Sequence, residues 1–254
     1  MLVLSLGTAG CGEAPDASSE DSDPATTHTL VFLDQSVSTG GHPEARALFA
    51  DSLRHIVHRH LRHPGDRLSL FLVHEHTLSK AHRVPLKNDV APLQQKEFPD
   101  EQALERARYR KETEQFLQAA TTRLQNVLES PPPTSTDWTD LWGTLGVAST
   151  KLSDEADEYR LYYLSDMFES MAGPARRNFD RRPPTARTQA QRWARADADT
   201  LDTFMILRPD RLQDARVRIL LGTLATKDHA QAVKFYWLTL LQELGLPRRH
   251  IDYN

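Results

Sequence analysis

The chain has 254 residues, which is enough for one α/β domain with a substantial core. Its net charge of −4, with 26% charged residues, argues against a general binder of nucleic acid or of another polyanion. No apolar run approaches the roughly 20 residues of a transmembrane helix, and a single cysteine excludes a disulfide within the chain.

The first eleven residues form a short apolar stretch that ends in Ala-Gly-Cys11. It resembles the end of a bacterial lipoprotein signal, although no basic residue precedes it and Thr8 stands where leucine is usual. Residues 12–27 follow, and almost all of them are small, polar or acidic, so we expect a disordered tether. The resemblance implies lipidation of Cys11 and attachment to the bacterial cell envelope. Gly12 favours the outer membrane in a Gram-negative cell, because some inner-membrane lipoproteins carry an aspartate there. The alternative is a frayed N-terminus with a free thiol.

Apolar strands and amphipathic helices alternate over residues 28–254. The patterns predict helices at 45–61, at 98–128 and at Ala230–Leu244, where Trp237 lies on the core-facing side. Between the last two, residues from Trp138 to Leu152 are expected to form a loop that enters a further helix. They predict strands at Thr29–Leu33, Arg67–His74, Arg160–Leu164, Leu201–Leu207 and Val217–Leu221. Such alternation predicts an α/β fold in one domain, with a doubly wound, mostly parallel sheet, the first strand central, and helices on its faces. The arginine-rich segment 174–195, which Pro183-Pro184 interrupts, is interpreted as a solvated, mobile excursion.

Polar side chains follow two of these strands directly. Thr29–Leu33 runs into Asp34, Ser36 and Ser38, so a buried strand ends in a carboxylate and two hydroxyls. Sheets of this class place ligands at the carboxyl ends of their strands, and such oxygens are the ligands that Mg²⁺ prefers. Downstream, Thr139-Asp-Leu-Trp-Gly-Thr-Leu145 leads into a helix, and Leu161-Tyr-Tyr-Leu-Ser-Asp166 is a second strand that ends in a carboxylate.

Together these three motifs resemble the metal-ion-dependent adhesion site (MIDAS) of von Willebrand factor A-type (VWA) domains. The similarity spans roughly residues 28–244 by element order, but only the three motifs match at residue level. Met167 departs from the family, which commonly has glycine there, and the inserted helix 98–128 lengthens the gap between the first two motifs. The resemblance implies a site for Mg²⁺ (or Mn²⁺) formed by Asp34, Ser36, Ser38, Thr139 and Asp166, with Thr136 as the alternative to Thr139.

A site of this kind implies an envelope-anchored binding module and not an enzyme. An open coordination position on the cation would capture an Asp or Glu carboxylate of another protein. We expect no small-molecule substrate, no nucleic acid, and membrane contact through the lipid anchor only. Two alternatives stay open: a metal-free scaffold with the same fold, and a haloacid-dehalogenase-like phosphohydrolase. The second needs an aspartate where this chain has Ser36.

Two groups of histidines have spacings that zinc could use, and we give both a simpler interpretation. The helical group lacks a cysteine or another well-spaced ligand, so we expect a solvated helix face. The strand group includes one member beyond a turn, so we expect no metal there. The first group is His55, His58, His60 and His63, and the second is His74, His76 and His82.

Overall fold

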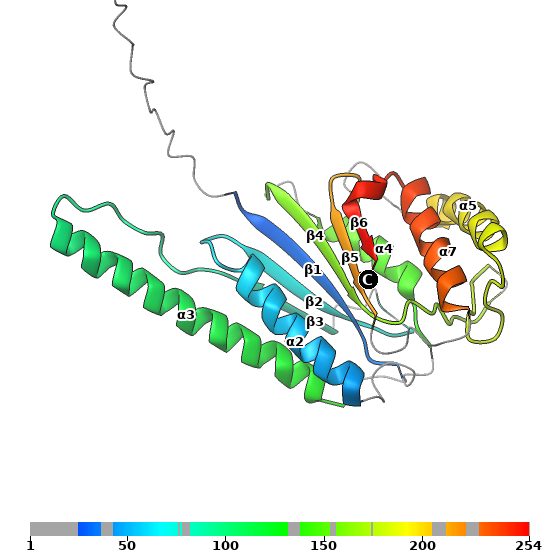
Figure 1. Ribbon diagram of the computed structural model, residues 1–254, viewed down its shortest axis with the longest axis horizontal. Coiled ribbons are helices and arrows are strands. Elements are labelled where there is room, and N and C mark those ends of the chain that lie inside the picture. Colours follow the sequence, from blue (N-terminus) through cyan, green and yellow to red (C-terminus); the bar gives the residue numbers. More distant parts are fainter. Residues whose placement is uncertain are drawn as a thin grey trace, which may run out of the picture.

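The computed structural model of the chain contains one sheet with the strand order β3-β2-β1-β4-β5-β6 (Figure 1). The structure describes residues 25–36, 43–75, 77, 82–131, 138–152, 156–173, 175–204, 212–221 and 229–253. Cys11, Ser38, Thr136, His76 and most of the expected tether lie outside these ranges.

The strands are short and the helices vary widely in length. The strands are β1 (Thr27–Asp34), β2 (Arg67–Val73), β3 (Arg83–Lys87), β4 (Glu158–Leu164), β5 (Arg216–Leu220) and β6 (Ile251–Tyr253). The helices are α2 (Pro43–His60), α3 (Pro99–Glu129), α4 (Leu141–Lys151), α5 (Arg187–Phe204) and α7 (Ala230–Glu243), and a 3-10 turn covers Arg248–His250. None of the helices in the described ranges has the length and apolar character needed to cross a membrane.

The prediction of a doubly wound sheet with a central first strand is confirmed. β1 pairs in parallel with β2 on one side and with β4 on the other. β5 and β6 continue the parallel arrangement, and β3 alone is antiparallel. The four residues from Leu30 to Leu33 are fully buried. A parallel strand covered on both faces is expected to be an uninterrupted apolar run, and this one is.

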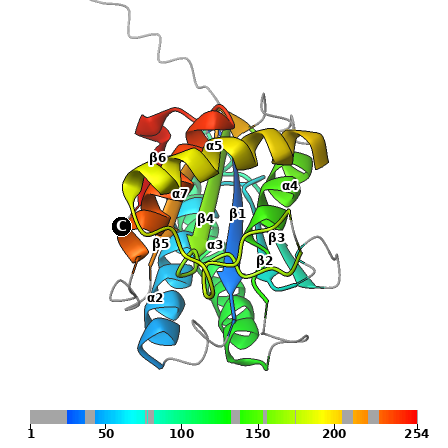
Figure 2. The same ribbon diagram turned by 90° about the vertical axis from the view of Figure 1, so that its right-hand side faces the viewer.

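Two hydrophobic cores lie on the two faces of the sheet. One contains α2, the second half of α3 and residues of β1, β2 and β4 that face them. The other contains α4, α5 and α7 and the alternate residues of the same strands. Figures 1 and 2 show α2 and α3 together, away from the pair formed by α5 and α7. Trp237 is 1% exposed within the second core, so the prediction that it is a packing residue is confirmed.

Residues 187–204 form α5, whereas the sequence predicts an arginine-rich solvated segment followed by a strand. The predicted strand Leu201–Leu207 is wrong for its first four residues, which are helical, and the remaining three lie outside the described ranges. A buried stripe of mostly small side chains explains the helix, because it lets α5 pack against α7. The stripe consists of Ala190, Ala194, Ala198 and Leu201.

The strands β3 and β6 were not predicted from the sequence. β3 is a half-exposed edge strand that contains Pro85, a residue that cannot donate a backbone hydrogen bond. β6 has three residues and obtains its partners from β5. β6 is too short to show a two-residue hydrophobic period in the sequence, and the proline within β3 argues against a strand there.

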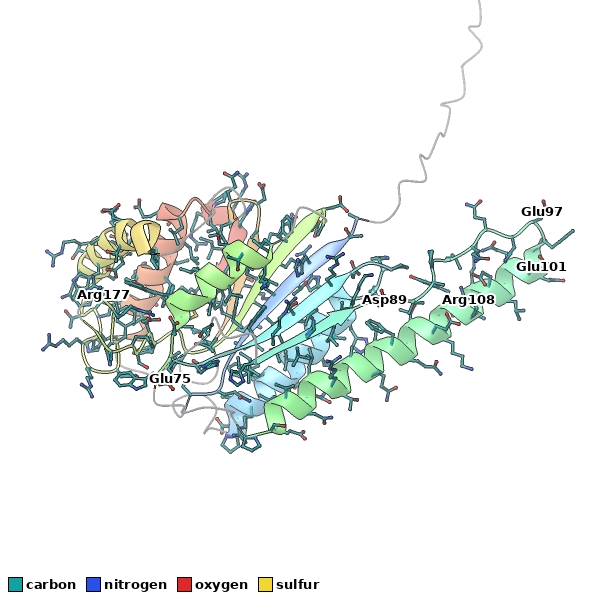
Figure 3. The ribbon with its side chains drawn as sticks, turned by 180° about the vertical axis from the view of Figure 1, so that it is seen from behind. Glu75, Asp89, Glu97, Glu101, Arg108 and Arg177 are labelled. Atoms are coloured by element: carbon teal, nitrogen blue, oxygen red, sulfur yellow. The ribbon has the colours of Figure 1, made fainter. Side chains whose placement is uncertain are left out.

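The first half of α3 extends beyond the sheet together with the segment 88–98 that precedes it (Figures 1 and 3). Its buried residues begin only at Leu117, whereas Phe98 and Leu104 are 62% and 75% exposed. The backbone amide of Gln94 donates to Glu105, so the returning segment is attached to the helix. Figure 3 shows Glu97, Glu101 and Arg108 on this arm, at the opposite end of the molecule from Arg177.

Candidate functional site

The end of β1 holds Asp34 in a defined orientation. Asp34 is the last residue of the strand and is 1% exposed. Its Oδ1 accepts a hydrogen bond from the backbone amide of Ser36 at 2.9 Å. Its Oδ2 accepts a hydrogen bond from the Ser165 hydroxyl at 2.7 Å, and Ser165 directly follows β4. The first and third motifs of the sequence are therefore in contact.

Asp166 lies at the end of β4, next to β1. The parallel register pairs Leu33 with Leu164, so the residues that follow both strands emerge side by side. Asp166 Oδ1 accepts the backbone amide of Phe168 at 2.9 Å, and the residue is 4% exposed. Burial, followed by the negative charge of Asp166, raises the pKa of Asp34 to about 6. Two buried carboxylates that are close enough for one to raise the pKa of the other are a setting that a cation would stabilise.

Met167 is compatible with this site, although the family commonly has glycine at the position. Its φ is 63°, in the left-handed region where glycine is favoured. The side chain is 1% exposed and belongs to the core that contains α7. Its carbonyl accepts the indole Nε1–H of Trp237 at 2.7 Å. The methionine therefore points into the core and does not cover the end of β4.

Thr139 is fixed to the chain that follows Asp166. Its amide donates to the Ser170 hydroxyl at 3.0 Å, and its carbonyl accepts the amide of Ser170 at 3.1 Å. The loop is also attached to the end of β2, because the Thr77 hydroxyl donates to the carbonyl of Asp140 at 2.9 Å. Thr139 is 3% exposed. The second motif thus lies at the same edge of the sheet as the other two.

A buried group of charges supports the start of α4, and we did not predict it from the sequence. Glu169 is fully buried, and its Oε2 accepts the backbone amides of Leu141 and Trp142 at 2.7 and 3.2 Å. Arg176 pairs with both Glu169 and Asp140 and lies over the ring of Trp142. Burial raises the pKa of Glu169, and the guanidinium of Arg176 opposes this effect. These contacts fix the start of α4 and, with it, the loop that contains Thr139.

Asp140 and the glycine three residues later form the cap of α4. Asp140 Oδ1 accepts the amide of Gly143 at 2.7 Å. A Cβ atom at residue 143 would lie 2.3 Å from Asp140 Oδ2, so the carboxylate requires glycine at this position. An acid directly before an apolar helix is a common N-terminal cap.

The described donors fit a hard divalent cation. Asp34 and Asp166 provide buried carboxylates, and Ser36 and Thr139 provide hydroxyls at the same edge of the sheet. Oxygen donors with few formal charges are the ligands of Mg²⁺ and Mn²⁺. Ser38, the fifth expected ligand, and Thr136 lie outside the described residues. Within the described ranges no three His, Cys, Asp or Glu residues are placed to hold a metal.

A cavity of about 530 Å³ lies beside the Thr139 loop. The interpretation of segment 174–195 as a solvated excursion is wrong for two of its arginines, because their acidic partners come from distant parts of the chain. Arg177 makes two hydrogen bonds of 2.6 Å to Asp197 and lies over the ring of Trp193. Arg181 and Arg182 are exposed. The aromatic and positively charged residues that line the cavity are Trp138, Arg176, Arg177, Arg181, Arg182 and Trp193.

Comparisons with known proteins found distant structural neighbours only. No protein-family model matches the sequence, and no curated protein matches it. Two structures of proximal thread matrix protein 1 from the mussel byssus overlay on 91% of the chain, with 9% and 11% identity and TM-scores of 0.41 and 0.42. One of them has zinc in the MIDAS motif of that protein.

The pilus adhesin SpaC from Lactobacillus rhamnosus GG overlays on 92% of the chain, with 13% identity and a TM-score of 0.43. The chain spans 44% of the mussel protein and 28% of the adhesin. Likenesses at this level assign neither a family nor a function. The doubly wound sheet and the common edge of the three motifs agree, on their own, with the VWA-like architecture that the motifs imply.

Proposed function

We propose that this chain is a binding module that captures a carboxylate of a partner protein through Mg²⁺ or Mn²⁺. The cation would be held by Asp34, Ser36, Ser38, Thr139 and Asp166. The observation that carries the proposal is the pair of buried carboxylates at the ends of adjacent strands, with serine and threonine hydroxyls at the same edge.

The residues of the chain have separate tasks in this proposal. Asp34 and Asp166 supply negative charge, and their hydrogen bonds to the amides of Ser36 and Phe168 keep them oriented. Ser165 holds Asp34 through its hydroxyl. When bound, the cation supplies Lewis acidity and an open coordination position for an external carboxylate. Because the hydroxyl ligands are neutral, two carboxylates leave little excess negative charge, which favours a further anionic ligand.

The cavity beside the Thr139 loop supports a partner that is acidic. Arg181 and Arg182 are exposed on its rim, and Arg176 and Arg177 are held by buried acids within it. Guanidinium groups beside a cation site would attract an acidic segment and orient it before the carboxylate is bound.

Calorimetric titration of Mg²⁺ and of Mn²⁺ into the full chain tests the proposal. We expect saturable binding in the wild type and none in Asp34→Asn or Asp166→Asn, which keep the side-chain size and remove the charge. Ser36→Ala should weaken binding without abolishing it. Asp89→Asn is the matched control, because this carboxylate is exposed and, among the described residues, its ion pair is with Lys87. Equal affinity in the wild type and Asp34→Asn would contradict the proposal.

A metal-free scaffold with the same fold is the alternative. Both oxygens of Asp34 already accept hydrogen bonds from the protein, so the end of β1 is satisfied without a ligand. An absence of any heat of binding for both cations, with the protein shown to be folded, would favour this scaffold. A phosphatase assay with a phosphomonoester distinguishes the binding module and the scaffold from a phosphohydrolase. Hydrolysis by the wild type that is lost in Asp34→Asn would favour the phosphohydrolase.

We also propose that the protein is anchored to a bacterial envelope membrane by a lipid on Cys11. The proposal rests on the Ala-Gly-Cys11 sequence and the acidic segment that follows it. Fractionation of cells that express the wild type and Cys11→Ser is the test. We expect the wild type with the membranes and the variant in the aqueous fraction, and an identical distribution of the two would contradict the anchor.

A further inference from the structure

We propose that this protein has a second ligand site, an arginine-lined cavity that binds a phosphate-bearing oxyanion. The cavity has a volume of about 370 Å³ and lies at the beginning of β4, β5 and β6, away from the candidate cation site. We call it the basic cavity. Its arginines are Arg59, Arg160, Arg216, Arg218 and Arg249.

Four separate elements bring these arginines together. Arg59 is in the last turn of α2, Arg160 is in β4, and Arg249 belongs to the turn before β6. Arg216 and Arg218 are alternate residues of β5, so they share one face of the sheet. Register pairs Arg160 with Arg216 on the neighbouring strand. The Tyr162 hydroxyl meets His60 of α2 at 2.7 Å, which identifies this as the α2 face.

Positive charge in the basic cavity exceeds the negative charge that is present to balance it. Arg160 pairs with Glu158, and Arg218 Nε lies 3.2 Å from Asp252 Oδ2. The other three arginines have no acidic partner among the described residues. They are Arg59, Arg216 and Arg249, and all three side chains are exposed. The whole chain carries a net charge of −4, so this concentration of arginine is local and not a general property of the surface.

Buried donors in the cavity have no acceptor in the protein. The Nε–H groups of Arg160 and Arg218 are buried and make no hydrogen bond, and Nδ1 of His250 is also unsatisfied. Asp252 is near Arg218 but is not in a geometry that satisfies its Nε–H. Buried polar groups in folded proteins nearly always have partners, so unsatisfied donors that line a cavity indicate a ligand that accepts hydrogen bonds.

The neighbouring histidine responds to the same positive field. Burial, and then the charges of Arg160 and Arg59, lower the pKa of His60 to about 3. His60 contacts the hydroxyl of Tyr162, and Tyr162 forms part of the cavity wall. Burial is the largest cause of this shift, and the two arginines add to it in the same direction.

Phosphate is the oxyanion that this arrangement fits best. A guanidinium group offers parallel N–H donors that match two oxygens of a phosphate, and it stays charged at all relevant pH values. Several guanidinium groups around a cavity of this volume can bind a ligand that carries more than one phosphate group. Two sources share this chemistry: a soluble oligophosphate and the headgroup of an anionic lipid. Thr27 pairs with Glu158 at the beginning of β4, so the chain enters the domain at the edge of the sheet where the basic cavity lies (Figure 1).

The test uses the full chain in buffer that a chelating resin has freed of divalent cations, so that it is independent of the candidate cation site. Pyrophosphate is titrated into the protein by calorimetry. In a second arm, protein is sedimented with vesicles of phosphatidylcholine alone or of phosphatidylcholine mixed with phosphatidylglycerol. The test variant is Arg216→Gln/Arg249→Gln. The matched control is Arg123→Gln/Arg192→Gln, which removes two exposed arginines that line neither this cavity nor the one beside the Thr139 loop.

We expect pyrophosphate or the anionic vesicles to bind the wild type and the control equally. Binding should fall at least about tenfold in the test variant, because charge-assisted hydrogen bonds are lost. Loss of pyrophosphate binding identifies a soluble ligand, and loss of vesicle binding alone identifies a headgroup. No binding in either arm, or the same affinity in the test variant and the wild type, would overturn the proposal. Thermal unfolding of both double variants checks that they are folded.

Discussion

At the end of β4, Met167 adopts a left-handed backbone conformation, with a φ of 63°. A non-glycine residue there costs on the order of 1 kcal/mol. The buried thioether side chain and the hydrogen bond from Trp237 to the Met167 carbonyl offset this cost. Packing against α7 thus explains how the turn between Ser165 and Phe168 forms without glycine.

Substitutions at Met167 should separate packing from backbone strain. Met167→Leu keeps the volume and the unbranched Cβ, so it should lower the free energy of unfolding by less than about 1.5 kcal/mol. Met167→Val is smaller and branched at Cβ, and it should cost about 2 kcal/mol or more. Urea unfolding monitored by circular dichroism measures both. Equal stability of the two variants would show that the conformation at this residue is not strained.

His60 makes the stability of the protein depend on pH. Its pKa falls from 6.5 to about 3 on folding, because of burial and then the charges of Arg160 and Arg59. The unfolded state therefore binds the proton more readily between these two values. The contribution of neutral His60 is complete above about pH 6.5 and is lost as the pH falls toward about 3.

The variant His60→Gln tests this dependence, because glutamine can bond the Tyr162 hydroxyl and does not titrate. We expect the wild type to lose more stability than the variant when the pH is lowered from about 7.5 to about 4.5. The difference in free energy of unfolding between the two proteins, measured by urea unfolding at several pH values, is the quantity to follow. A constant difference would contradict the pKa shift.

At the scale of elements, the start of α4 depends on one close contact. Gly143→Ala should destabilise the protein by about 1–2 kcal/mol although alanine favours helices, because the new Cβ displaces the Asp140 cap. The cost should largely disappear when Asp140 is also replaced by alanine. A double-mutant cycle of Gly143→Ala and Asp140→Ala, read by thermal unfolding, measures this coupling. Additive effects would mean that the contact is not the cause.

The two halves of α3 should differ in local stability. Buried side chains begin at Leu117, and the first half of the helix contacts little besides the segment 88–98. Hydrogen exchange read by mass spectrometry should therefore be much faster in residues 99–114 than in residues 117–128. Equal protection along the helix would indicate that the arm is covered, for example by a second molecule.

At the scale of the whole molecule, the two cores share one sheet and should unfold together. Leu30 faces the core that contains Trp142 and Trp237, and Leu33 faces the other. Leu30→Ala and Leu33→Ala should each cost about 2–5 kcal/mol. Tryptophan fluorescence and circular dichroism should report the same transition in both variants. A Leu33→Ala protein whose fluorescence transition is unchanged would show that the cores unfold separately.

The sequence alone was sufficient where a signal is local and periodic. The run Thr29–Leu33 predicted a buried central strand, because parallel strands covered on both faces are typically uninterrupted apolar runs. The residues after the strands, Asp34 and Asp166, could then be assigned to a common edge, because parallel strands end together.

Tertiary structure decided what depends on partners from distant parts of the chain. Arg176 and Arg177 appeared solvated in the sequence, because their partners Glu169, Asp140 and Asp197 lie in other segments. The same is true of α5, whose alanine stripe has meaning only against α7. The basic cavity requires four elements to meet, so no window of the sequence contains it. Local periodic patterns determine the central strand and the amphipathic helices, whereas edge strands, charges and small side chains acquire their roles only from the surfaces that folding brings against them.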